Sequence, residues 1–388
     1  MPTPRLLAKE LLSQARHYPI VTLTGPRQAG KSTLAKMCFP KKQYFSLEDP
    51  DIREFALSDP REFLKKCNRN AILDEIQKAP ELLSYLQTQV DEQSKAGQFI
   101  LSGSQNFQLS HAVSQSLAGR TAVLKLLPFS MAECKQWTSK FSIEQWIYTG
   151  FYPRIYDKKL NPYKAYKNYY ETYVERDVRA LIHLKDLSLF QKFIRLCAGR
   201  IGQVFVASHL ANEVGVSVPT IQSWISILEA TFILFFLPPY FANINKRMIK
   251  SPKLYFFDVG LANYLLGNET VKQTGSHPLF GALFENMVVM ELLKGRWNQG
   301  LDEHLYFYRD SSQKEVDVIF QKGHELVPIE IKSSSTFHSD FLKNIDYFKT
   351  LFPSAEKKGY VITSSMHSQM IKDTSVVHYS HTSQITLS

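Results

Sequence analysis

The segment GPRQAGKS has the composition and spacing of a phosphate-binding loop. Glycine permits backbone conformations that turn successive N–H groups toward phosphate oxygens, while the lysine adds a charge and the serine hydroxyl can ligate Mg²⁺. The pattern G-x-x-x-x-G-K-S therefore predicts a site for ATP with Mg²⁺. The predicted ATP-binding residues are Gly25, Pro26, Arg27, Gln28, Ala29, Gly30, Lys31, Ser32 and Thr33.

Two adjacent carboxylates follow a second apolar run. Asp74 and Glu75 come directly after Ala71–Ile72–Leu73, as expected of a strand that delivers side chains to the edge of a sheet. We expect Asp74 to act in the magnesium shell and Glu75 to orient or deprotonate the attacking water. The alternative is a pair of solvated carboxylates at the end of an exposed strand.

A third apolar run leads into a small polar turn. Residues 98–101 precede Ser102, Gly103 and Ser104, which places a hydroxyl beside the expected γ-phosphate. Ser104 is the first candidate for such a sensor of the phosphate and Ser102 the second. A plain S-G-S turn is the alternative explanation.

These residues need a parallel sheet to bring them together. Residues 20–24, IVTLT, resemble a buried parallel strand, and the helix-like TLAKMC follows the loop. Strand, glycine loop and helix in that order predict an α/β domain with the candidate residues at one edge of its sheet.

With these motifs, residues 1–135 resemble the AAA-type ATPases, and SLAGR and PFS extend the match. The chain is also similar to a prokaryotic family in which this ATPase module precedes a conserved C-terminal domain of poorly defined function; TGFYPRIY, YYETYVERDVRAL and FGALFENMVVMEL carry that likeness. The resemblance implies a homo-oligomeric ring in which an arginine of a neighbour completes the site. Arg120 and Arg176 are the candidates for this arginine finger, with ordinary surface arginines as the alternative.

The C-terminal part combines a helix with strands that carry charged residues. Asp317 lies in EVDVIF, and Glu330 and Lys332 lie in VPIEIKSS, where strand alternation puts the last two on one face. This pattern resembles the PD-(D/E)xK fold of restriction-type nucleases over residues 275–365. The resemblance implies that Asp317 and Glu330 bind metal, that Lys332 positions or activates water, and that Glu285 is an additional ligand. The alternative is a nuclease-like platform that cleaves nothing.

The middle of the chain contains an aromatic stretch and a helix-turn-helix pattern. Tyrosines interleaved with lysines after Arg154 are interpreted as a helical core rather than as a surface that stacks on bases. In VASHLANEVGVSVPTIQSWISILEATFIL, Ser217 caps a second helix that opens near Pro219. The predicted DNA contacts are a basic wing formed by Lys246, Arg247 and Lys250, with a solvated hairpin as the alternative.

Composition sets the remaining expectations. A chain of 388 residues exceeds a single ordinary core, and its net charge of +10 suits a polyanionic partner. Four scattered cysteines, no apolar run of membrane-spanning length and no signal peptide favour the cytoplasm. The predicted fold class is α/β: an AAA-type ATPase core (1–135), a helical lid or linker (136–190), a winged-helix-like region (191–270) and a restriction-endonuclease-like α/β module (275–388).

Overall fold

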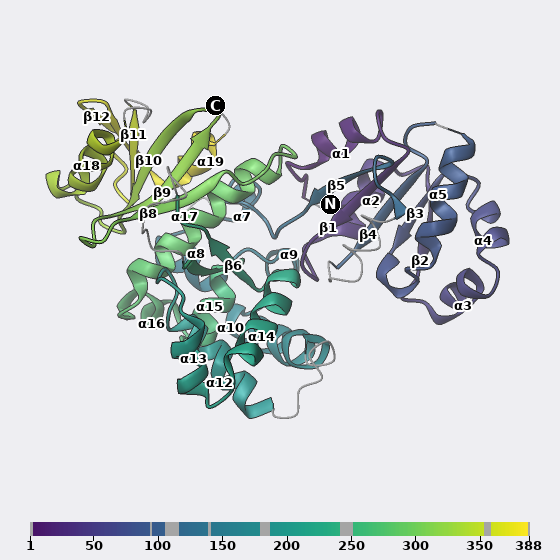
Figure 1. The fold of residues 1–388 in the computed structure, drawn as a ribbon, viewed down its shortest axis with the longest axis horizontal. Coiled ribbons are helices and arrows are strands. Elements are labelled where there is room, and N and C mark those ends of the chain that lie inside the picture. Colours follow the sequence, from purple (N-terminus) through teal and green to yellow (C-terminus); the bar gives the residue numbers. More distant parts are fainter. Residues whose placement is uncertain are drawn as a thin grey trace.

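The computed structural model describes residues 3–93, 95–104, 116–138, 141–178, 187–240, 251–352 and 358–386, apart from the side chains of residues 175–178. The first sheet and its helices lie at one end of the molecule, a second sheet lies at the other end, and a helical region lies between and below them in the view of Figure 1. None of the helices in these ranges is both long and apolar enough to cross a bilayer.

The N-terminal sheet is parallel and has the strand order β2-β3-β4-β1-β5. Helices cover both of its faces: α1 and α2 share one hydrophobic cluster with it, and α4 and α5 share the other. The three central strands β1, β3 and β4 are buried along their whole length and are mostly apolar, whereas the edge strands β2 and β5 are partly exposed. The strands are β1 (Ile20–Thr24), β2 (Gln43–Ser46), β3 (Ala71–Asp74), β4 (Phe99–Gly103) and β5 (Thr121–Lys125). The helices are α1 (Ala8–Gln14), α2 (Lys31–Cys38), α3 (Pro50–Ser58), α4 (Pro60–Lys66), η1 (Ile76–Lys78) and α5 (Leu82–Glu92). This parallel α/β arrangement confirms the expectation for the ATPase core.

The middle region is mostly helical. The elements are α7 (Lys135–Thr138), α8 (Ile143–Thr149), α9 (Pro153–Asp157), α10 (Pro162–Tyr169), η2 (Tyr170–Val178), α12 (Leu187–Ala198), α13 (Ala207–Val214), α14 (Val218–Ala230), β6 (Leu234–Leu237), β7 (Lys253–Phe256), α15 (Val259–Leu265) and α16 (Val271–Ser276). The interpretation of the tyrosines as core is confirmed for Tyr156, Tyr166, Tyr169, Tyr170 and Tyr173, which are buried, whereas Tyr163 is only half-buried.

A helix-turn-helix lies within this region. Helix α13 ends at Gly215, whose φ of 89° is left-handed, and Ser217 accepts a hydrogen bond from Thr220 N at the start of α14. Glycine suits the first position because it has no Cβ that would strain a left-handed backbone, and serine suits the second because its hydroxyl accepts a bond from an N–H group that has no partner within the helix. The antiparallel pair β6 and β7 follows. The described elements follow one another as helix, turn, helix and strand pair, and the winged-helix-like unit stays a prediction.

The C-terminal region packs a long helix against a mixed sheet of order β12-β13-β11-β10-β9-β8. Its elements are α17 (Phe280–Trp297), β8 (Leu305–Arg309), β9 (Glu315–Lys322), β10 (Glu325–Ile331), η3 (Ser339–Leu342), α18 (Lys343–Leu351), β11 (Gly359–Thr363), β12 (Gln369–Ile371), β13 (Thr374–His378), η4 (Tyr379–His381) and α19 (Thr382–Ile385). Helix α17 is buried on nearly all sides, including the polar residues Asn286, Glu291 and Lys294. A helix of this kind belongs to the interior of a large core.

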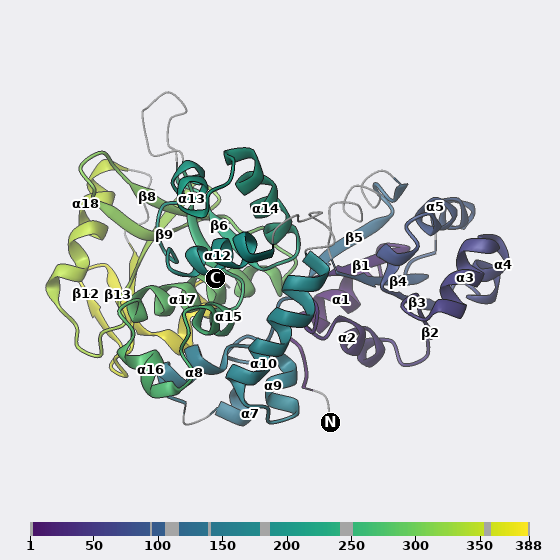
Figure 2. The same ribbon diagram turned by 90° about the horizontal axis from the view of Figure 1, so that it is seen from below.

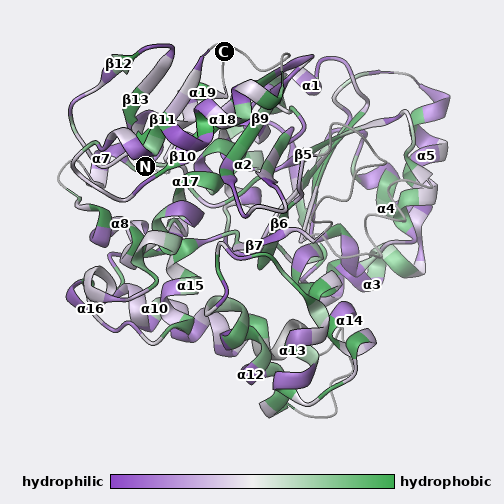
Figure 3. Ribbon diagram, turned by 60° about the vertical axis from the view of Figure 1, so that its left-hand side comes forward, coloured by the Kyte–Doolittle hydropathy of each residue, from purple (hydrophilic) through white to green (hydrophobic). Residues whose placement is uncertain are grey.

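One hydrophobic cluster extends from Leu127 to Ile385 and includes residues of both the helical region and the C-terminal sheet. Hydrophobic stretches run along the strands of both large sheets in Figure 3. The two regions therefore share a core, whereas the N-terminal sheet has separate clusters of its own.

Candidate functional site

The loop between β1 and α2 contains three residues with positive φ, a backbone conformation that glycine adopts more easily than other residues. Gly25, Gln28 and Gly30 all have positive φ, at 149°, 62° and 93°. Lys31 is buried as the first residue of α2, and its Nζ donates to Gly25 O at 2.9 Å and to Pro26 O at 2.8 Å. Burial lowers the pKa of Lys31 to about 8, against the opposing effect of Glu75 and Asp74. The loop thus holds a poorly solvated cation, which a phosphate group would stabilise.

Gly25 should not tolerate a side chain. A Cβ at this position would lie 2.1 Å from Leu126 O, which is a backbone atom that cannot move aside cheaply. We expect Gly25→Ala to lower the thermal stability and the nucleotide affinity together. Thermal unfolding and nucleotide titration would measure both.

Gly267→Ala is the matched control for this prediction. Gly267 also has a positive φ, of 84°, but a Cβ there would have open space. The Gly267→Ala substitution should lower the free energy of unfolding by about 1–2 kcal/mol, because alanine adopts a left-handed backbone less easily than glycine. It should leave the nucleotide affinity unchanged. Equal destabilisation by the two substitutions would mean that the close approach to Leu126 is unimportant.

Asp74 lies at the same edge of the sheet as the loop. The parallel register places Asp74 beside Ser102, and Ser102 beside Leu23, two residues before Gly25. The buried Ser102 hydroxyl donates to Asp74 Oδ1, and the Tyr44 hydroxyl donates to Oδ2 at 2.6 Å. Both carboxylate oxygens are therefore held in a fixed orientation.

Tyr44 was not indicated by any motif. It ends up beside Asp74 because β2 pairs with β3, and burial together with the bond to Asp74 raises the pKa of its hydroxyl. The ammonium of Lys36 lies 3.4 Å from the centre of the Tyr44 ring. The only local signal in the sequence is the pair of aromatic residues in QYFS, which suits a short strand.

Glu75 is in a strained conformation, with a φ of 57°. Non-glycine residues adopt left-handed backbone at a cost, and such residues concentrate at functional sites. Gln77 donates both to the Glu75 carboxylate and to Ser104 Oγ, the latter at 2.9 Å. The structure thus joins Ser104 to Glu75 through Gln77, a residue that the sequence motifs did not indicate.

The chemistry of these residues fits a nucleoside triphosphate with Mg²⁺. Ser32 and Asp74 offer a hydroxyl and a carboxylate, which are the hard oxygen ligands that Mg²⁺ prefers, and Lys31 offers a cation to the phosphates. A pocket of about 380 Å³ adjoins the loop, with Gln28 and Tyr169 in its lining. Figure 2 shows the helix formed by α10 and η2 on the side of the molecule that faces α1 and α2.

Arg5 connects the phosphate-binding loop to residues 127–133 through hydrogen bonds. Its buried guanidinium donates to Ala29 O at 2.7 Å, to Leu127 O at 2.7 Å and to Glu133 Oε1 at 3.0 Å. Further along, Met131 N donates to Glu291 of α17 at 3.0 Å. A chain of polar contacts therefore runs from the loop to α17.

The two candidate arginine fingers have different positions. Arg120 lies at the amino ends of β1 and β5, on the opposite edge of the sheet from the loop, since Ile20 N donates to Arg120 O. Two guanidinium nitrogens of Arg120 contact the Asp91 carboxylate at 2.6 and 2.8 Å. Arg176 lies in η2, and its side chain is outside the described part of the structure.

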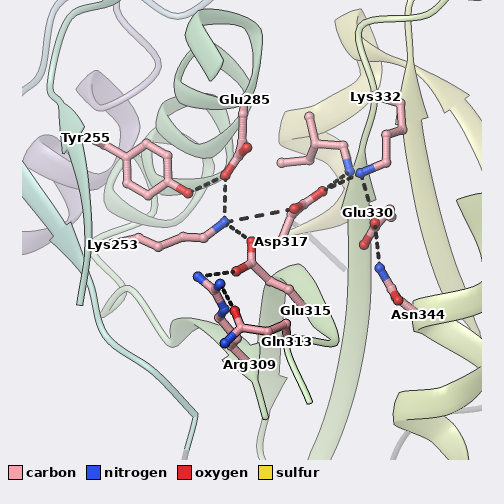
Figure 4. A network of polar contacts seen from close by, with 11 residues as sticks. Lys253, Tyr255, Glu285, Arg309, Gln313, Glu315, Asp317, Glu330, Lys332 and Asn344 are labelled. Atoms are coloured by element: carbon pink, nitrogen blue, oxygen red, sulfur yellow. Dashed lines mark hydrogen bonds and ion pairs between the residues drawn. The ribbon is translucent and has the colours of Figure 1, made fainter. Parts of the chain in front are cut away.

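A second polar centre contains the three C-terminal candidates (Figure 4). Lys332 Nζ lies 3.2 Å from Asp317 Oδ2 and 2.9 Å from Glu330 Oε1. Burial and the nearby Asp317 raise the pKa of Glu330 to about 8, and its Oε2 is buried without a hydrogen-bond partner among the described residues. Burial acts to lower the pKa of Lys332, but the carboxylates of Asp317 and Glu330 outweigh this effect and raise it.

Lys253 enters the same centre from β7. Its Nζ lies 2.6 Å from Glu315 Oε1, 3.0 Å from Glu285 Oε1 and 3.9 Å from Asp317 Oδ1. Tyr255 OH donates to Glu285 Oε1 at 2.6 Å. Sequence reasoning missed Lys253 and Tyr255, because nothing in the local sequence indicates that β7 reaches this centre. It also missed Glu315, although strand alternation on β9 puts Glu315 on the same face as Asp317.

The side chains of this centre do not fit the metal that the nuclease resemblance implies. Ammonium groups lie between the carboxylates, and the described residues contain no group of three or more His, Cys, Asp or Glu side chains placed to hold a metal ion. The predicted metal ligands Asp317 and Glu330 lie close together, but Lys332 contacts both of them and occupies the space between their carboxylates. Glu285, the additional candidate ligand, contacts Lys253.

The predicted DNA contacts cannot be placed. Lys246, Arg247 and Lys250 lie outside the described residues. On α14, Gln222 and Ser223 are exposed. The exposed face of this helix is therefore polar and uncharged at these two positions.

Three regions of the chain match known family models. Residues 17–135 match a family described as an AAA domain, residues 140–272 match a domain of unknown function, DUF8612, and residues 280–382 match another, DUF4143. Residues 17–135, which contain the loop described above, are thus similar to a P-loop domain of the AAA type.

Comparisons with whole proteins extend over most of the chain. The uncharacterized proteins Rv2008c of Mycobacterium tuberculosis and Mb2031c of Mycobacterium bovis are each 29% identical to it over 329 residues, which are 84% of this chain and 73% of each relative. Among solved structures, the Walker-type ATPase PABY2304 of Pyrococcus abyssi is 14% identical, with a TM-score of 0.46, over 68% of this chain and 98% of that one. AMPPCP-bound DnaA from Aquifex aeolicus is 14% identical, with a TM-score of 0.30, over 57% and 86%.

Proposed function

We propose that this chain binds ATP with Mg²⁺, hydrolyses it, and uses the cycle to change how its C-terminal regions engage a partner. The observation that carries the proposal is the meeting of the phosphate-binding loop, Asp74, Ser102 and Glu75 at one edge of a parallel sheet. The AAA-domain match of residues 17–135 supports the same chemistry.

Each residue has a distinct role in this proposal. The backbone N–H groups of residues 25–33 and the Lys31 ammonium bind the phosphates, and Ser32 and Asp74 would hold Mg²⁺. Mg²⁺, when bound, neutralises charge on the β- and γ-phosphates. Glu75 orients or deprotonates the attacking water, while Ser104 contacts the γ-phosphate end.

Coupling to the C-terminal regions would run through Arg5. Its contact with Ala29 O makes the position of the guanidinium dependent on the shape of the loop, and Glu133 and the segment around Met131 connect it to α17. Lys294 of α17 donates back to Phe129 O at 2.8 Å. A loop that closes on phosphate can thus bias the packing of the helix that lies in the shared core.

Nucleic acid is the partner class that we propose first. The net charge of +10, the helix-turn-helix and the basic sequence of residues 246–250 favour a polyanion. The second candidate function is a nucleotide-dependent switch with a noncatalytic C-terminal platform. The two lysines within the acidic centre favour this second possibility.

One experiment tests ATP turnover, the partner and assembly together. ATP hydrolysis is measured with and without single- and double-stranded DNA, and light scattering gives the mass in each nucleotide state. We expect hydrolysis that DNA accelerates, with the acceleration falling as salt rises, and an ATP-dependent oligomer larger than a dimer. Glu75→Gln protein would be used for the mass measurement in ATP, because it should bind ATP without hydrolysing it.

The outcomes separate the alternatives. Slow hydrolysis that DNA does not change, with nucleotide-dependent release of another partner, would support the switch. A mass that stays monomeric at all protein concentrations and in all nucleotide states would contradict completion of the site by Arg120 or Arg176 of a neighbour.

A further inference from the structure

We propose that the ammonium group of Lys253 takes the place of a divalent cation in the acidic centre, so that the centre joins two regions of the chain without metal. Lys253 is almost fully buried, at 2% exposure, and has three carboxylates within 4 Å. Figure 4 shows its Nζ between Glu285, Glu315 and Asp317. A buried ammonium needs such partners, because an isolated buried charge is strongly unfavourable.

The lysine and the carboxylates come from different regions. Lys253 is on β7, within the region that matches DUF8612, whereas the carboxylates are on α17 and β9, within the region that matches DUF4143. The position of β7 is fixed by its backbone: Asn286 of α17 accepts from Phe256 N at 2.7 Å and donates to Phe256 O at 3.0 Å. Lys253 is therefore part of a rigid interface and not a mobile surface side chain.

A second lysine adds to the positive charge around Asp317. Asp317 contacts Lys253 through Oδ1 and Lys332 through Oδ2, so both of its oxygens face ammonium groups. Glu330, the other predicted ligand, also contacts Lys332. A divalent cation bound to Asp317 would lie close to two positive charges in a poorly solvated site, where like charges repel strongly.

Removal of the Lys253 charge should therefore create a metal site. We would measure Mn²⁺ binding by electron paramagnetic resonance and thermal unfolding with and without Mn²⁺, in nucleotide-free protein so that the P-loop does not contribute. We expect Lys253→Met to lower the melting temperature by roughly 10 °C, because it leaves buried carboxylates unpaired. This variant should bind one Mn²⁺ ion per chain, and the bound ion should restore much of the lost melting temperature.

Three comparisons define the specificity of this result. Wild type should show neither Mn²⁺ binding nor a Mn²⁺-dependent melting shift. Lys322→Met removes an exposed lysine from the end of β9 and should behave as wild type. Lys253→Met with Asp317→Asn should lose the Mn²⁺ binding that Lys253→Met gains.

Three results would overturn the proposal. The first is a folded Lys253→Met protein that binds no Mn²⁺. The second is wild-type binding of one Mn²⁺ that Asp317→Asn abolishes. The third is Mg²⁺-dependent DNA cleavage by wild type that requires Asp317, Glu330 and Lys332. The second and third results need no Lys253 variant, so they decide the question even where Lys253→Met fails to fold.

Discussion

Glu75→Gln protein is expected to bind ATP with nearly wild-type affinity and to hydrolyse it about 10²–10⁴-fold more slowly. General-base catalysis contributes rate factors of this size, and an amide cannot accept the proton of the attacking water. The substitution preserves the shape of the side chain that Gln77 contacts. Phosphate release at saturating ATP and the dissociation constant of a fluorescent nucleotide would be measured separately.

The matched control is Glu81→Gln, which neutralises an exposed glutamate just before α5 and should leave both quantities unchanged. Wild-type turnover by the Glu75→Gln protein would remove Glu75 from its role. The strained backbone at this residue would then need another explanation.

Lys31→Ala is expected to weaken nucleotide binding by about 100-fold. A hydrogen bond to a charged group contributes roughly 1.5–3 kcal/mol, and each 1.4 kcal/mol corresponds to a factor of ten. Isothermal titration with ATP and Mg²⁺ would measure the loss. Circular dichroism and thermal unfolding would show that the variant remains folded.

Lys41→Ala is the control, because it removes an exposed lysine a short distance beyond the same helix. If both variants bound ATP equally well, the contribution of Lys31 would be nonspecific or absent. A loss in Lys31→Ala alone would support phosphate binding at the loop.

The first site could be predicted from the sequence because its determinants are local. Gly25 to Thr33 form one continuous motif, and Asp74 and Glu75 directly follow an apolar strand. Parallel strands have their carboxyl ends at one edge of the sheet, so residues that directly follow such strands lie at the same edge. The parallel sheet and its helices were expected on the same grounds.

Residues that depend on distant pairing could not be predicted. Arg5 contacts Glu133, which is 128 positions away, and Tyr44 reaches Asp74 only because β2 lies beside β3. Lys253 has an ordinary sequence context and acquires its partners only when β7 packs against α17. The nuclease-like pattern of Asp317, Glu330 and Lys332 was visible in the sequence, but the neighbouring lysine that changes its meaning was not.

The shared core has a consequence for the folding of the chain. Leu127 to Ile385 contribute to one hydrophobic cluster, and α17 lies within it with most of its surface covered. Regions that share a core unfold cooperatively, since neither can lose its packing without exposing the other. A chain cut near residue 275 would therefore separate two incomplete halves, each with an exposed apolar face prone to aggregation. The N-terminal sheet, with clusters of its own, is the part of this chain best suited to fold in isolation.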